Sequence, residues 1–134
     1  MTPEELLPNE AGKWLRQAAK DLNAARLLVE AEPTRSLFHS QQAAGKAAKA
    51  FLAYRNIPFR KTHDLADLGA QCAELNPGLG PILREAADLT DYASAFRYPE
   101  APYEPDAEEA AQALVTAERL CRQVQSLLPD VEAG

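Results

Sequence analysis

The chain has 134 residues, of which 46% are hydrophobic, 7% aromatic and 25% charged. This length suits one domain, and we expect a single domain over 1–134, with its core at about 9–128 and acidic ends that fray. The formal net charge of −6 argues against non-specific nucleic-acid binding, which requires a basic domain, but it is compatible with a local basic site.

Two long helices are expected in the first half of the chain. Abundant alanine favours helix there, and apolar residues at helical spacing predict a first helix from a cap at Asn9 to about Ala31. Thr34 or Ser36 can cap the second helix. That helix must stop near Asn56, because the proline two residues later disfavours helical geometry in the residue before it.

Three more helices are expected in the second half. A short one covers about 64–74, and a longer one covers about 79–96 after an Asn-Pro-Gly turn. The last helix begins after Asp106, which has the spacing of a capping box with Glu109, and runs to about Leu128. No segment alternates with the period of two that marks a strand. The expected fold is therefore all-α, an up-down four-helix bundle with one extra short helix.

The apolar side of each helix predicts the core. Residues on these sides recur every three or four positions and point in one direction from their helix. The larger ones that we expect to be buried are Trp14, Leu22, Phe51, Leu52, Leu83, Leu89, Leu114 and Leu120.

A polar stripe follows one face of the second helix. Its members fall within an arc of roughly 80°, and they are His39, Gln42, Lys46 and Lys49. Two ammonium groups beside an amide and an imidazole suit a site for an anion or a nucleotide. The alternative is a solvated face whose lysines pair with carboxylates, for which Asp64, Asp91 and Glu100 are candidates.

Other titratable residues lie near helix ends. His63 beside Asp64 can act as an acid or base, or it can pack over a helix end. Arg97 is expected in the last turn of its helix, where it either stabilises free carbonyl groups or projects into a cleft and binds phosphate.

Several chemistries have no signature in the sequence. Two cysteines, Cys72 and Cys121, have no framework or metal spacing and are expected to be free thiols. His39 and His63 with Asp64 lack the spacing of metal ligands, so we expect neither a metal nor a cofactor. Neither a signal peptide nor a membrane-spanning stretch is apparent, which predicts a cytoplasmic protein.

Three motifs together resemble the HEPN family of prokaryotic helical proteins. They are FHSQQAAGKAAKAFL (38–52), HDL (63–65) and YASAFRYP (92–99), and the resemblance covers roughly 11–128. It implies a helical bundle that commonly forms two-fold dimers. It also implies, for many members, a small nucleotidyltransferase partner in a toxin–antitoxin pair. Other members were proposed to bind nucleotides.

The RNase members of this family carry an Arg and, a few residues later, a His. Arg97 occupies the place that resembles the family's Arg, and Tyr98 follows it. Where the His is expected, the chain has Tyr103 and its neighbours instead, with no histidine among them. The resemblance therefore does not assign ribonuclease activity.

Three functions are compatible with the sequence. The first is a nucleotide- or RNA-phosphate-binding partner of a nucleotidyltransferase. Its site would be a cleft lined by Lys46, Lys49 and Arg97, with Gln42 on the same stripe and with His39, His63 and Tyr98 on the rim. The second is a metal-independent ribonuclease toxin that uses Arg97 with His63 or Tyr103. The third is a dimeric helical scaffold without catalytic function or ligand.

We predict a two-fold homodimer in solution. A chain this short has more alanine-rich helix faces than one core can bury, and isologous pairing is the commonest way to bury the surplus. Light scattering at micromolar concentration should give about twice the chain mass of 14.6 kDa. A mass equal to that of one chain would contradict this prediction.

Overall fold

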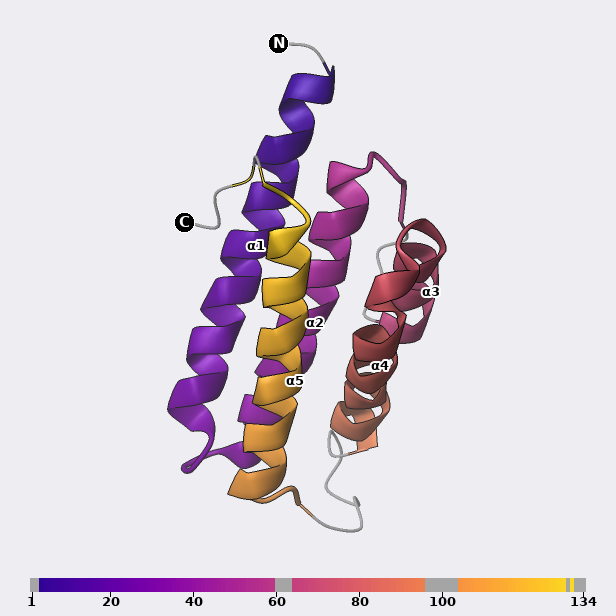
Figure 1. Ribbon diagram of the computed structural model, residues 1–134. Helices are drawn as coiled ribbons and strands as arrows, with labels where there is room; N and C mark the ends of the chain where they lie inside the picture. Colours follow the sequence, from indigo (N-terminus) through magenta and orange to yellow (C-terminus); the bar gives the residue numbers. More distant parts are fainter. Residues whose placement is uncertain (1–2, 60–63, 96–103, 130, 132–134) are drawn as a thin grey trace.

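Five α-helices make up the part of the chain that the structure describes (Figure 1). The computed structural model describes the backbone of residues 3–59, 64–95, 104–129 and 131, and the side chains of residues 8–59, 64–89, 104–129 and 131. These ranges contain no strand, which confirms the expected all-α class. The helices are α1 (Pro3–Leu28), α2 (Pro33–Tyr54), α3 (Leu65–Leu75), α4 (Gly80–Ala95) and α5 (Ala107–Ser126), and a 3-10 turn, η1 (Pro77–Leu79), precedes α4.

The long helices run alternately up and down. Figure 1 shows α1 and α4 running in one direction and α2 and α5 running in the other. α1 packs against α2 along much of its length, and α5 packs against both of them and against α4. α3 and α4 lie on the side of α2 that faces away from α1. α2 is thus the central helix of the bundle.

The first helix begins earlier than the sequence pattern indicates. α1 starts at Pro3 and ends at Leu28, so the expected cap, Asn9, lies inside the helix. Pro8 is also inside it. A proline there removes one backbone hydrogen bond, but the helix continues through it.

The start of α2 also differs from expectation. Glu32 occupies the N-cap position without a side-chain cap, and Pro33 begins the helix. Proline is favoured there because its missing N–H has no partner in the first turn. Ser36, one of the two expected caps, lies within α2, and its hydroxyl donates to the carbonyl oxygen of Ala25 in α1 at 2.7 Å. It links two helices instead of ending one.

The remaining helix ends follow the local sequence signals. The side chain of Asp64 accepts a hydrogen bond from the N–H of Ala66, and that of Asp106 accepts one from the N–H of Glu109. Asn56, where the second helix was expected to stop, has a φ of 56°. This left-handed conformation is one that asparagine tolerates, and it turns the chain away from the α2 axis.

The core is built mainly from leucine and alanine. Seven of the eight large residues expected in it are buried, and Trp14 is the exception because it is only partly buried. Its indole lies at the edge of the core, where its ring stands edge to face with Phe59 at 5.9 Å. In the described part of the chain, no helix combines the length and apolarity that crossing a membrane requires.

Both cysteines are free, as expected. Burial raises the pKa of Cys72 to about 12. The pKa of Cys121 is also raised to about 12, chiefly by burial and further by the charge of Glu118. Both thiols are therefore protonated at neutral pH, and neither is an activated nucleophile.

Replacing Phe51 should test the inner face of α2. Phe51 is only 2% exposed, so Phe51→Ala should lower the free energy of unfolding by about 3–5 kcal/mol through lost burial and a residual cavity. Leu27→Ala is the control because Leu27 is 74% exposed, and it should change stability by less than about 0.5 kcal/mol. Denaturant melts measure both. A loss below about 1 kcal/mol for Phe51→Ala would show that this face is not buried.

Candidate functional site

A buried carboxylate lies in the seam between α1 and α2. Asp21 is only 9% exposed, and its neighbours one turn away in α1, Ala18 and Ala25, belong to the core. An ionised carboxylate without partners would be costly at such a position, because burial removes its hydration. The partners of its two oxygen atoms therefore determine how the seam is held together.

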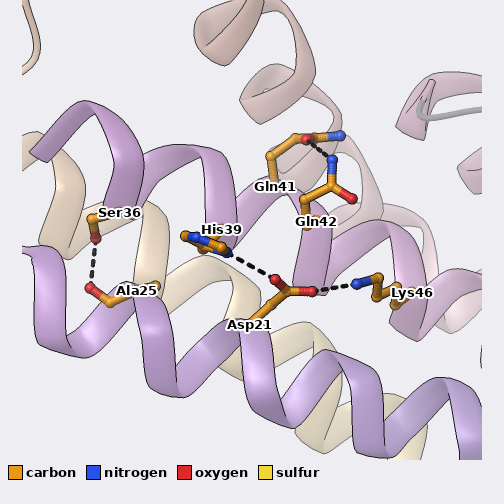
Figure 2. Close-up of polar contacts among 7 residues, drawn as sticks. All are labelled: Asp21, Ala25, Ser36, His39, Gln41, Gln42 and Lys46. Carbon is orange, nitrogen blue, oxygen red and sulfur yellow. Dashed lines mark hydrogen bonds and ion pairs between the residues drawn. The ribbon is translucent and has the colours of Figure 1, made fainter.

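Each oxygen of Asp21 contacts a side chain of α2 (Figure 2). The Nδ1 atom of His39 lies 2.8 Å from Oδ1, and the ammonium of Lys46 lies 2.6 Å from Oδ2. His39 and Lys46 are about two helical turns apart on one face of α2. One carboxylate from α1 therefore bridges two members of the polar stripe.

The contact with Asp21 determines which nitrogen of the His39 ring carries a hydrogen. A carboxylate only accepts hydrogen bonds, so Nδ1 of His39 must carry a hydrogen and donate it. The side chain is 32% exposed, and its ring stands edge to face with Phe38 at 5.6 Å. Nε2 is then the ring atom through which His39 can accept a hydrogen bond when neutral, or donate one when protonated.

Lys49 lies one turn beyond Lys46 and has a different partner. Its ammonium is 5.2 Å from the centroid of the Trp14 ring, a cation–π contact. Burial, and then the charge of Lys46, lower the pKa of Lys49. Within the described part of the chain, no carboxylate lies at salt-bridge distance from it. Its charge is therefore not neutralised by an ion pair with any described residue.

Gln42 adds a polar group to the same face of α2. Its side-chain nitrogen donates to the side-chain oxygen of the buried Gln41 at 3.1 Å. Gln42 itself is half-buried. Its carboxamide is oriented by this contact and can add directed hydrogen bonds to the charges of the lysines.

The structure brings part of the predicted site together. His39 and Lys46 meet at Asp21, and Gln42 and Lys49 lie on the same face of α2. The other predicted members, His63, Arg97, Tyr98 and Tyr103, lie outside the described residues. The cleft expected to join Arg97 to the two lysines stays a prediction.

Sequence reasoning missed the carboxylate that pairs with Lys46. The three carboxylates expected to pair with the lysines did not include Asp21. Of those three, Asp64 caps α3, and the side chains of Asp91 and Glu100 lie outside the described residues. The available signal was the position of Asp21 beside Leu22 on the inner face of α1, because a charged residue on a buried stripe requires a partner.

The chemistry of this face is that of charge and hydrogen bonding. Among the described residues, no group of three His, Cys, Asp or Glu side chains is arranged to hold a metal ion. The face instead presents the ammonium of Lys46 paired with Asp21, the ammonium of Lys49 over the Trp14 ring, and the imidazole of His39. Such a set can bind an anionic ligand.

Comparison with known proteins gives one match. A family model for the HEPN domain matches residues 11–127, a range that includes all of α2 and most of α1. No curated protein and no solved structure matches the chain significantly. The match confirms the resemblance that the three sequence motifs indicated.

Removing the charge of Asp21 should weaken the α1–α2 seam. Asp21→Asn leaves Lys46 and His39 without their carboxylate, and the free energy of unfolding should fall by about 1–3 kcal/mol. Glu10→Gln is the matched control, since Glu10 pairs with Lys13 at 3.5 Å on the exposed surface. It should change stability by less than about 0.5 kcal/mol. Equal effects of the two variants in denaturant melts would contradict a structural role for Asp21.

Proposed function

Because the chain belongs to the HEPN family, we propose that it is a homodimeric module that binds the phosphate groups of a nucleotide or RNA and acts with a nucleotidyltransferase in a toxin–antitoxin-type pair. The resemblance to the family motivates the partner. The binding site is the half-buried face of α2 that carries Gln42, Lys46 and Lys49, with His39 at its edge. The observation that carries the proposal is the charge of Lys49 beside Lys46, for which the described residues provide no carboxylate at salt-bridge distance.

The balance of charge supports an anion at this face. Asp21 supplies one negative charge, which offsets Lys46. Lys49 contacts the Trp14 ring, and its pKa is lowered first by burial and then by the positive charge of Lys46. A phosphate next to Lys49 would relieve this repulsion, since an opposite charge favours the protonated amine.

The neighbouring groups support a phosphate in particular. Two ammonium groups one turn apart can contact different oxygens of one phosphate or of neighbouring phosphates. The amide of Gln42 and the imidazole of His39 add hydrogen bonds on the same helix face. Because Asp21 holds Lys46 and His39 in place, these groups are oriented before a ligand arrives, which lowers the entropic cost of binding.

Binding should depend on Lys49 and on salt. We expect a fluorescein-labelled short RNA to bind, with ATP as a competitor, and the affinity measured by anisotropy should fall as salt rises. Lys49→Ala should weaken binding and reduce the magnitude of the slope of log K against log salt by about 0.7, the value for one phosphate contact in a single strand. Lys46→Ala should also weaken binding. Lys20→Ala removes an exposed lysine of α1 and should leave the slope unchanged.

The pH dependence of binding in the same assay tests the role of Lys49, and the fate of the RNA separates the alternative functions. Affinity should also fall in the alkaline range, at a lower pH than for a lysine of ordinary pKa 10.5, because the lowered pKa means that Lys49 loses its proton sooner. Lys49→Arg keeps the charge and should move this loss to higher pH. Shortening of the RNA at neutral pH, absent from a sample without protein, would favour the ribonuclease. Equal binding by the parent, Lys49→Ala and Lys20→Ala would overturn the proposal, and no binding at all would favour the scaffold.

A further inference from the structure

A second surface of the bundle is hollowed where α4 meets α5. A cavity of about 290 Å³ opens there. Leu37, Leu89 and Ala113 contribute apolar side chains to its lining, and the carboxylates of Asp88 and Glu109 lie beside them. The hollow therefore has an apolar floor and an acidic rim.

The hollow continues across the surface of α5. A second, shallow depression of about 380 Å³, lined by residues of α5 alone, shares Gln112 and Thr116 with the first cavity. Glu108 and Val115 line it, and Val115 is 53% exposed, which makes it one of the most exposed large apolar side chains among the described residues. We call the two cavities together the α4–α5 groove.

The acidic rim of the α4–α5 groove is not neutralised by the residues that the structure describes. Within the described part of the chain, none of Asp88, Glu108 and Glu109 has a lysine or arginine at salt-bridge distance. Glu108 and Glu109 lie in the first turn of α5, where the helix dipole favours carboxylates. Asp88 lies in the second half of α4, and no such local reason accounts for it.

Arg119 does not neutralise the rim because it has a partner of its own. It pairs with Glu85 of α4 at 3.0 Å, and this bridge spans the same two helices. Three carboxylates thus line the α4–α5 groove, and the described residues provide no lysine or arginine to pair with them. A ligand for this surface must combine apolar side chains with positive charge.

The shape of the groove favours a helix as that ligand. Glu108, Val115 and the residues between them follow about two turns of α5, and a helix can pack against two neighbouring helices by inserting its side chains between theirs. Addition of an extended strand requires a free sheet edge, and the described part of the chain has no strand. Apolar residues spaced three or four apart on one face of a helix would match the hollows.

We propose that the α4–α5 groove is a docking site for a basic amphipathic helix of a partner protein. Leucine-sized side chains of that helix fill the hollows beside Leu89 and Val115. Its lysines or arginines pair with Asp88, Glu108 and Glu109. The groove does not involve Lys46 or Lys49, so the proposal stands independently of phosphate binding.

The test uses a synthetic amphipathic peptide of leucine and lysine, about 14 residues long and labelled with fluorescein. Anisotropy at physiological salt should show binding to the full chain. A peptide with glutamate in place of lysine should not bind. Because the chain is acidic overall, this difference alone does not locate the contact, and matched variants of the chain are needed.

Two pairs of variants locate the contact. The double variant Asp88→Asn with Glu108→Gln should weaken binding at least about fivefold. The control double variant Glu30→Gln with Glu32→Gln removes the same charge from exposed positions between α1 and α2, and it should weaken binding less than about twofold.

The apolar contact is tested in the same way. Val115→Ser should weaken binding about threefold or more, because the peptide loses an apolar contact. Leu27→Ser, at a more exposed apolar residue of α1, should have no effect. Methyl NMR shifts on peptide addition give a measurement that needs no variant: Val115 and Leu89 should shift and Leu27 should not. Equal losses in both double variants, or unshifted methyl signals of Val115 and Leu89, would overturn the proposal.

Discussion

One carboxylate determines how the two longest helices fit together. The seam between α1 and α2 is rich in alanine, and small side chains of similar shape can slide past one another with little loss of packing. Asp21 contacts His39 and Lys46 at once, and only one register of α1 against α2 allows both contacts. Ser36 adds a second link to the carbonyl of Ala25. Polar pairing thus supplies the specificity that alanine packing lacks.

The same carboxylate divides the cations of α2 into two kinds. Lys46 and His39 contact Asp21, so they stabilise the α1–α2 seam and also belong to the polar stripe of α2. The ammonium of Lys49 contacts the Trp14 ring, and the pKa of Lys49 is lowered by burial and by the charge of Lys46. The fold therefore places Lys49, whose charge no described carboxylate compensates, next to Lys46, which Asp21 already orients. In this arrangement, the residue that stabilises the seam also shapes the candidate site.

The sequence predicted the features that depend on a single helix, and it missed the contacts that depend on how two helices pack together. Helical periodicity predicted the five helices, and the side chain of Asp106 caps α5 as expected. The same periodicity placed Lys46 and Lys49 on one face. The Asp21 contacts and the α4–α5 groove depend instead on which helices are neighbours and how closely they pack. A pattern along one helix does not contain that information.

The two candidate surfaces lie on opposite sides of α2. Leu37 contributes to the α4–α5 groove, and Lys46 follows nine positions later, which at about 100° per residue is half a revolution. A polyanion is attracted to the lysines and repelled by the acidic groove, and a basic helix experiences the opposite forces. The chain can thus separate two ligands of opposite charge without a contact between them. On a protein with a net charge of −6, this separation requires the cations to be clustered, as they are on α2.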